Sequence, residues 1–183
     1  MLKVSDNPPM IWPEETPLAE FQGTWWVAHT KSRNEKALAQ DLRGKEIAYF
    51  LPMHWQVRRK KGRTFKSLLP LFTGYLFFCG NEPDRIEVLR TNRVANLLEV
   101  KDQQQLVCEL SQFEQTIRSG ANLSPHPYLK KGQRCRVTGG PLADLQGIVE
   151  RIKGATQLIL QIDMLGQAAS VEIETDMIET LDE

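Results

Sequence analysis

The stretch "GGPLADLQGIV", residues 139–149, lies between two short segments, "RCRVT" and "IVERI", whose apolar residues alternate as in β-strands. The glycines and proline at 139–141 are typical of a tight turn, and Gly147 allows the next strand to run close to its neighbours. The stretch therefore predicts a loop between two paired strands. Its tip presents Leu142 and Leu145, either as an exposed docking surface or as caps over the core beneath.

The chain around this loop, from residue 131 to residue 183, consists of short strand-like segments separated by brief breaks. An open sheet of such short strands buries little core, whereas curling into a small barrel removes the sheet edges. We therefore predict a small all-β, SH3-like barrel, preceded by a proline-containing linker at residues 121–130. The expected strands are "QRCRVT", "GIVERI", "QLILQIDML", "ASVEIE" and "MIETL".

The preceding segment, residues 23–120, mixes strand and helix patterns. "TWWVAHT" is rich in strand-forming residues, and "SRNE" after it matches a capping box with Ser32 as N-cap and Glu35 three residues later. The helix that follows is expected to end near Lys45. Its basic face is expected to carry Arg33, Lys36, Gln40 and Arg43.

More strands and two more helices follow in this segment. "HWQVRRKKGRTFKSLLP" predicts a hairpin with its turn at Gly62, and further strands are expected at "IAYFLP", "GYLFFCG" and "VANLLEV". One helix is expected to begin near Pro83, and another to run from Asp102 to Gly120. The fold class predicted for the whole chain is α+β: a mainly antiparallel sheet packed with helices, followed by the all-β barrel.

Residues 1–22 contain four prolines and little apolar periodicity, so we predict a disordered extension. Charge is also uneven: residues 22–80 carry eleven lysines and arginines against three acidic residues, although the whole chain is neutral. This basic third is expected either to touch a polyanion locally or to be a solvated surface.

The composition argues against catalysis and secretion. The three histidines and three cysteines show no metal-ligand spacing, and no phosphate-binding glycine loop or nucleophile elbow is present. An odd number of widely spaced cysteines fits a reducing cytoplasm, and no apolar run is long enough to span a bilayer. We expect no enzyme activity, no cofactor, no metal and a cytoplasmic protein.

Both halves resemble one family. "RVTGGPLADLQGIVERI" with "MLGQAASVE" is similar to the KOW domain of NusG-type transcription elongation factors. "WWVAHTKSRNEKALAQDL" and "PLFTGYLFF" resemble the family's N-terminal (NGN) domain, in the same order along the chain. Gln167 stands where the family usually has Arg, and Ser170 where Pro is usual, so a specialised paralogue is as compatible with the sequence as a general factor.

The resemblance implies a factor that binds the β′ clamp helices of RNA polymerase, contacts the non-template DNA strand, suppresses pausing, and recruits Rho or ribosomal protein S10. Positions matching the polymerase-binding patch are His29, Phe72, Tyr75 and Phe77; of these aromatics, Phe72 is expected to be the most exposed because it lies at the bend before the strand. Positions matching the DNA contacts are Lys31, Arg33, Lys36, Thr91 and Asn92. Positions matching the KOW partner surface are Leu145, Met164, Leu165 and Gln167.

Two other classes of function stay open. The first is a free RNA-binding module, although "GYLFFCG" lacks the glycine–aromatic pattern of an RNA-stacking RRM strand. The second is a ribosome-associated KOW protein, although such proteins are usually basic throughout and residues 121–183 here carry net negative charge.

Overall fold

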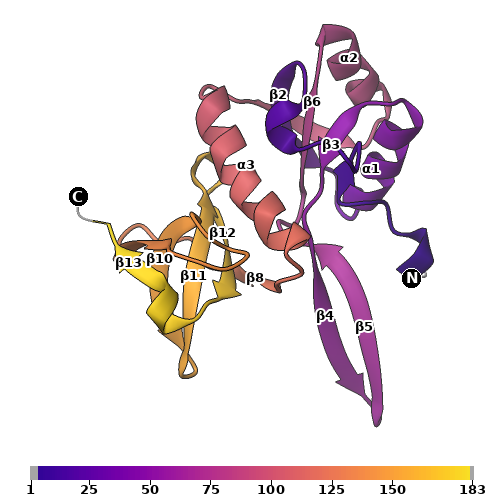
Figure 1. Cartoon of the computed structure of the whole chain (residues 1–183). Helices are drawn as coiled ribbons and strands as arrows, with labels where there is room; N and C mark the ends of the chain where they lie inside the picture. The colour runs from indigo at the N-terminus through magenta and orange to yellow at the C-terminus, as the bar shows by residue number, and fades with distance from the viewer. Residues whose placement is uncertain (1–3, 182–183) are drawn as a thin grey trace. The chain divides into compact units, whose positions relative to one another are not determined.

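The computed structural model describes residues 4–181. It divides into two compact units, Met1–Gln103 and Gln104–Glu183. Helices and antiparallel sheets make up the fold, so the predicted α+β class is confirmed (Figure 1). The division falls at the start of helix α3 (Gln103–Arg118), whereas the sequence placed the boundary after residue 120.

The first unit is built on a five-stranded antiparallel sheet in the order β1-β3-β6-β2-β7. Four of its strands were predicted and are present with small shifts at their ends: Thr24–Thr30 (β2), Ala48–Phe50 (β3), Tyr75–Gly80 (β6) and Val94–Glu99 (β7). The fifth, Ile11–Trp12 (β1), was not predicted. Two helices accompany the sheet, α1 (Glu35–Gly44) and α2 (Glu82–Arg90).

One face of this sheet forms a core with α1 and α2. Leu38 and Leu42 lie one turn apart on α1 and pack with Leu76 and Phe78 of β6, and Val88 of α2 joins the same cluster. All five side chains are fully buried. Burying a large apolar side chain contributes about 1.5–3 kcal/mol, so this cluster fixes α1 and the second half of α2 on the sheet.

The start of α1 differs from the prediction. Its N-cap is Asn34, not Ser32, and no side chain caps the first turn. Glu35 instead turns inward, and its buried carboxylate accepts a hydrogen bond from the Gly74 backbone N–H at 2.7 Å. The capping box appears at α2, where Asn81 and Asp84 each accept a hydrogen bond from the other's backbone N–H at 2.9 Å.

The prediction of a disordered N-terminal extension is wrong for the residues that the structure describes. Strand β1 adds to the edge of β3, and the Tyr49 hydroxyl donates to the Pro9 carbonyl at 2.8 Å. Trp12 lies under the Arg43 guanidinium, 5.0 Å from its ring centroid, and Leu18 is fully buried. A few bulky apolar residues thus bury enough area to outweigh the entropy of ordering a polar, proline-rich segment.

The predicted hairpin is confirmed as a separate two-stranded sheet of β4 (Met53–Lys60) and β5 (Arg63–Pro70). Lys60 pairs with Arg63 across a two-residue turn. Both turn residues have positive φ, 48° at Lys61 and 74° at Gly62, as a type I′ turn requires. Figure 1 shows the two strands extending together away from the five-stranded sheet.

The second unit contains α3 and a six-stranded antiparallel sheet in the order β13-β9-β10-β11-β12-β8. The five predicted strands are all present: Arg134–Val137 (β9), Gln146–Ile152 (β10), Ala155–Ile162 (β11), Gln167–Glu172 (β12) and Ile178–Thr180 (β13). The sixth, β8 (Leu123–His126), lies in the segment predicted to be a linker. Two prolines there do not exclude a strand, because β8 is at the sheet edge.

Gly147 of β10 occupies the close approach that the sequence predicted. A Cβ atom at this position would lie 2.4 Å from the carbonyl oxygen of Ile159 on the neighbouring strand. Only glycine therefore fits there without moving the strands apart.

Candidate functional site

An exposed ring pair lies at one end of the first sheet. His29 of β2 and Tyr75 of β6 are direct cross-strand neighbours, so their side chains share a face of the sheet. Their rings are stacked with centroids 5.2 Å apart and planes 26° apart. His29 is exposed and Tyr75 is half-buried. We call His29 and Tyr75 the stacked pair.

Phe72 and Phe77 adjoin the stacked pair but are not exposed. Phe77 lies two residues beyond Tyr75 on the same face and is 0% exposed, and Phe72 is 2% exposed. Phe77 meets Phe72 edge-on at 6.4 Å between centroids and Phe50 at 6.3 Å. The expectation that Phe72 is the most exposed of these aromatics is therefore wrong, because the bend turns its ring inward.

The candidate DNA-binding residues come from two segments far apart in the sequence that meet at one place. The Lys31 ammonium donates to the Asn92 side-chain oxygen at 2.7 Å, and the Lys31 N–H donates to the Arg93 carbonyl at 2.8 Å. Lys31 and Asn92 are both exposed. Thr91 is engaged in ending α2, because its hydroxyl donates to the Val88 carbonyl at 2.7 Å.

The expected continuous basic face of α1 is not present. Arg33 is exposed but precedes the helix, with a φ of 59°. Lys36 is half-buried and donates to the Leu68 carbonyl; burial lowers its pKa, and the nearby Glu35 opposes that shift. Gln40 donates to the Asp6 carbonyl at 2.9 Å, and Arg43 lies over Trp12. Lys31 and Arg33 are thus the cations most open to a partner at this end of α1.

The residues predicted to bind a partner in the second unit are likewise partly buried and partly exposed. Leu145 is only 1% exposed, so the alternative in which it caps the core holds and the exposed-tip alternative is wrong for this residue. Its carbonyl accepts from the Val137 N–H at 2.9 Å, which draws the loop back onto β9. Met164 is 42% exposed, and Leu165 and Gln167 beside it are half-buried.

Helix α3 contacts the same loop within this unit. Gln112 accepts a hydrogen bond from the Gln146 N–H at 2.6 Å, and Gln115 donates to the Ala143 carbonyl at 2.9 Å. Backbone groups of a loop need partners when they are withdrawn from water, and these glutamines supply them. The loop that the sequence singled out is therefore anchored from both sides.

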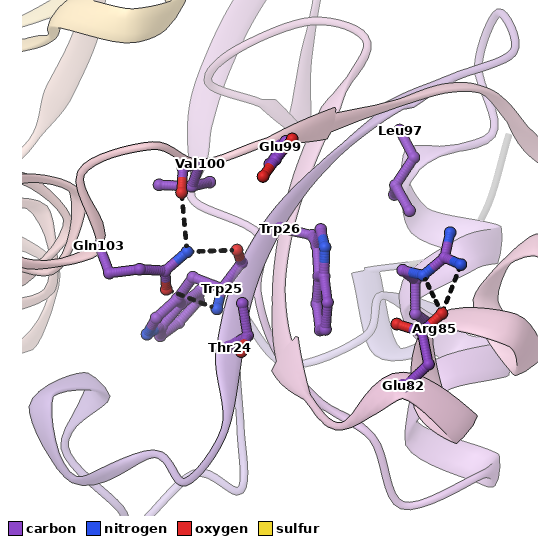
Figure 2. A pocket seen from close by; sticks show the side chains of 9 residues that line it. All are labelled: Thr24, Trp25, Trp26, Glu82, Arg85, Leu97, Glu99, Val100 and Gln103. Atoms are coloured by element: carbon purple, nitrogen blue, oxygen red, sulfur yellow. Dashed lines mark hydrogen bonds and ion pairs between the residues drawn. The ribbon is translucent and has the colours of Figure 1, made fainter.

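The first unit also contains a cavity of about 430 Å³, lined by nine residues (Figure 2). The Gln103 side-chain oxygen accepts from the Trp25 backbone N–H at 2.8 Å, and its side-chain nitrogen donates to the Trp25 carbonyl at 2.9 Å. The Gln103 amide thus continues the hydrogen bonding along β2 past the end of β7. Arg85 donates to Glu82 one turn earlier on α2 at 2.8 Å, and this bond lowers the pKa of the Glu82 carboxyl. The lining holds no cysteine, serine or histidine to act as a nucleophile or base.

Two general findings concern the described part of the chain, residues 4–181. No group of three or more histidine, cysteine, aspartate or glutamate side chains there is placed to hold a metal ion. None of the helices within that range is long and apolar enough to cross a membrane.

Sequence reasoning missed one set of surface residues. Trp55, Val57 and Phe65 on the β4–β5 hairpin are about half exposed, although each is a type that is usually covered. The sequence did contain a signal for them: bulky apolar residues stand among the cations of the predicted hairpin, and no predicted helix or strand was assigned to cover them.

A protein-family model matches the chain. Residues 23–115 match the family model described as transcription termination factor NusG. The match covers β2 through most of α3, so it includes the stacked pair and the Lys31–Asn92 contact. No curated protein matches the chain. Because the matched region makes up just over half of the 183 residues, the chain belongs to the NusG family of transcription elongation and antitermination factors, which bind RNA polymerase.

Proposed function

We propose that this protein binds RNA polymerase at the β′ clamp helices through the stacked pair and thereby suppresses pausing. The observation that carries the proposal is the His29–Tyr75 stack, which reaches the surface beside the buried aromatics Phe72 and Phe77. Aromatic side chains held rigid before binding lose little entropy on docking and commonly dominate interface energetics. Phe72 and Phe77 contribute indirectly, by packing in the core beside the stacked pair.

The non-template DNA strand is proposed to pass the end of α1. Lys31 and Arg33 are exposed there, and Asn92 fixes the Lys31 ammonium at 2.7 Å. Lys36 and Thr91 contribute less, because their polar groups already bond backbone carbonyls. Each phosphate contact to a single strand contributes roughly −0.7 to the slope of log affinity against log salt, so two cations give about −1.4.

The second unit is proposed to be a KOW domain that recruits a protein, either Rho or ribosomal protein S10. Exposed Met164 with half-buried Leu165 and Gln167 supports a small apolar docking surface there. Leu145 is buried and is not part of the proposed docking surface. We propose residues 23–120 as the NGN domain and residues 131–183 as the KOW domain, which β8 extends by one edge strand.

The test of the polymerase proposal is binding of the His29→Ala/Tyr75→Ala double variant to a β′ clamp-helix fragment. We expect at least a tenfold loss of affinity and loss of pause suppression, since a rigid aromatic anchor is typically worth about 2 kcal/mol or more. Phe65→Ala, which truncates an exposed ring on the hairpin, is the matched control and should bind the fragment normally. Normal binding by the double variant would move the docking surface elsewhere.

A further inference from the structure

The β4–β5 hairpin carries an unbalanced positive charge. Between Met53 and Pro70 the chain has no acidic residue and six cations: Arg58, Arg59, Lys60, Lys61, Arg63 and Lys66. All six are exposed, and no ion pair reaches any of them from residues 4–181. Elsewhere in the first unit, cations such as Lys45, Arg85 and Arg93 are paired with carboxylates. The hairpin therefore retains a charge that no described carboxylate neutralises, so an anionic partner can bind it.

The cations are distributed over both faces of the ribbon. Val57 pairs with Lys66 and Arg59 with Thr64, so Arg59 and Lys66 share one face with Val57. The opposite face carries the other strand cations, Arg58, Lys60 and Arg63, together with Phe65. Lys61 lies in the turn between the faces.

Bulky apolar side chains on the hairpin are exposed among these charges. Trp55 and Phe65 are each 47% exposed and Val57 is 55% exposed. Trp55 and Val57 are on one face and Phe65 is on the other. Both faces of the hairpin therefore expose a bulky apolar side chain.

A polyanion that surrounds the ribbon fits this distribution best. The major groove of B-form DNA is about 12 Å wide, admits a two-stranded β-ribbon, and has a phosphate backbone along each wall. A single strand would instead stack its bases on aromatics gathered on one face, beside cations on that same face. Here the aromatics and the cations are divided between two faces.

We propose that the tip of the β4–β5 hairpin inserts into the major groove of duplex DNA and binds the phosphates of both walls. Val57 and Phe65 lie on the same two faces as the hairpin cations and then contact sugars along the two walls, which excludes water without requiring a fixed sequence. This duplex contact is separate from the single-strand contact proposed for Lys31 and Arg33, and it uses none of the same residues.

The test measures binding of the full chain to a fluorescent 30-bp duplex of mixed sequence over a range of salt concentrations. With five or six phosphate contacts, the slope of log affinity against log salt should be about −5, at roughly −0.9 per contact. Two variants separate the faces: Arg59→Ala/Lys66→Ala on one and Arg58→Ala/Arg63→Ala on the other. Each should reduce the slope by about 1.8 and weaken binding at 0.1 M salt at least tenfold.

Lys101→Ala/Lys153→Ala removes two exposed cations elsewhere and should leave both quantities unchanged. All four substituted hairpin side chains are exposed, so melting temperatures should stay close to that of the parent protein. An effect confined to one face, or tighter binding to a 30-nucleotide single strand than to the duplex, would overturn groove insertion. Unchanged binding by both hairpin variants would overturn any nucleic-acid role for the hairpin. The clamp-helix fragment contains no DNA, so failure here leaves the polymerase proposal unaffected.

Discussion

Replacing Phe77 with alanine tests whether the aromatics near the polymerase-binding surface are structural or contact the partner directly. Phe77 is 0% exposed on β6, faces Val27 directly across the sheet, and meets Phe50 and Phe72 at 6.3 and 6.4 Å between ring centroids. Truncation removes the whole ring and leaves a cavity in the core. The hydrogen bonds of β6 to β2 and β3 hold the backbone in place, so the strands cannot easily move to fill it.

The expected loss of stability is large. Phe→Ala substitutions in protein cores cost about 3–5 kcal/mol, and the two ring–ring contacts account for roughly 0.5–1.5 kcal/mol each within that total. For a domain of roughly 100 residues, each kcal/mol lowers the melting temperature by about 4–8 °C. We therefore expect Phe77→Ala to melt at least about 12 °C below the parent protein.

Tyr75→Ala is the matched comparison, because Tyr75 is an aromatic residue on the same strand and face but only half-buried. Its removal should cost about 1–2 kcal/mol, mostly from the lost stack on His29, while weakening binding to the clamp-helix fragment at least tenfold. Calorimetry and urea titration give the stabilities, and binding is measured at a temperature at which both variants are folded.

Two outcomes would refute this reasoning. If Phe77→Ala melts within a few degrees of the parent, its ring is not part of the core. If folded Phe77→Ala loses as much affinity for the fragment as Tyr75→Ala, the ring contacts the partner directly and the assignment of Phe77 to structural support is wrong.

Three further predictions concern the fold. Leu18→Ala should lower the free energy of unfolding by about 2–5 kcal/mol in a urea titration, whereas no change would indicate that the N-terminal segment does not pack. Gly147→Ala should destabilise the second unit, because the alanine Cβ would lie 2.4 Å from the carbonyl oxygen of Ile159. If the variant's two-dimensional NMR spectrum shows unchanged chemical shifts for β10 and β11, this prediction is wrong. Burial raises the pKa of the Tyr49 hydroxyl, so the stability that this residue contributes to the fold is fully present below about pH 10 and is lost as pH rises further. Between about pH 9 and 11.5, Tyr49→Phe should therefore lose less free energy of unfolding than the parent protein. Parallel curves of unfolding free energy against pH would refute this assignment.

Local pattern predicted most of the elements. Alternating apolar residues located the strands of both units, and the turn at Lys61–Gly62 was expected from its glycine and the charges around it. The helix expected to end near Lys45 and the helix expected from Asp102 to Gly120 are present as α1 and α3. These features depend on residues within a few positions of each other, so the sequence alone specifies them.

Position along a strand did not predict exposure. Tyr75 and Phe77 share a face, yet only Tyr75 reaches the surface. Phe72 was expected at an exposed bend, and Leu145 was left open between an exposed loop tip and a cap over the core. Both are buried, because a turn can direct its side chain back onto the core that it leaves. Similarly, Ser32 matched a capping motif, but Glu35 was drawn away by the Gly74 N–H, which lies 39 residues further along the chain.

The sequence by itself determined the helices, every described strand except β1 and β8, the family resemblance and the concentration of positive charge in one third of the chain. Only the tertiary structure brought Lys31 to Asn92, placed β1 on the sheet edge, and divided the hairpin cations between two faces. The physical reason is that secondary structure follows from steric preferences and periodicity among near neighbours. Burial and side-chain partnership depend instead on which distant segments cover a given face, and that information is distributed over the whole chain.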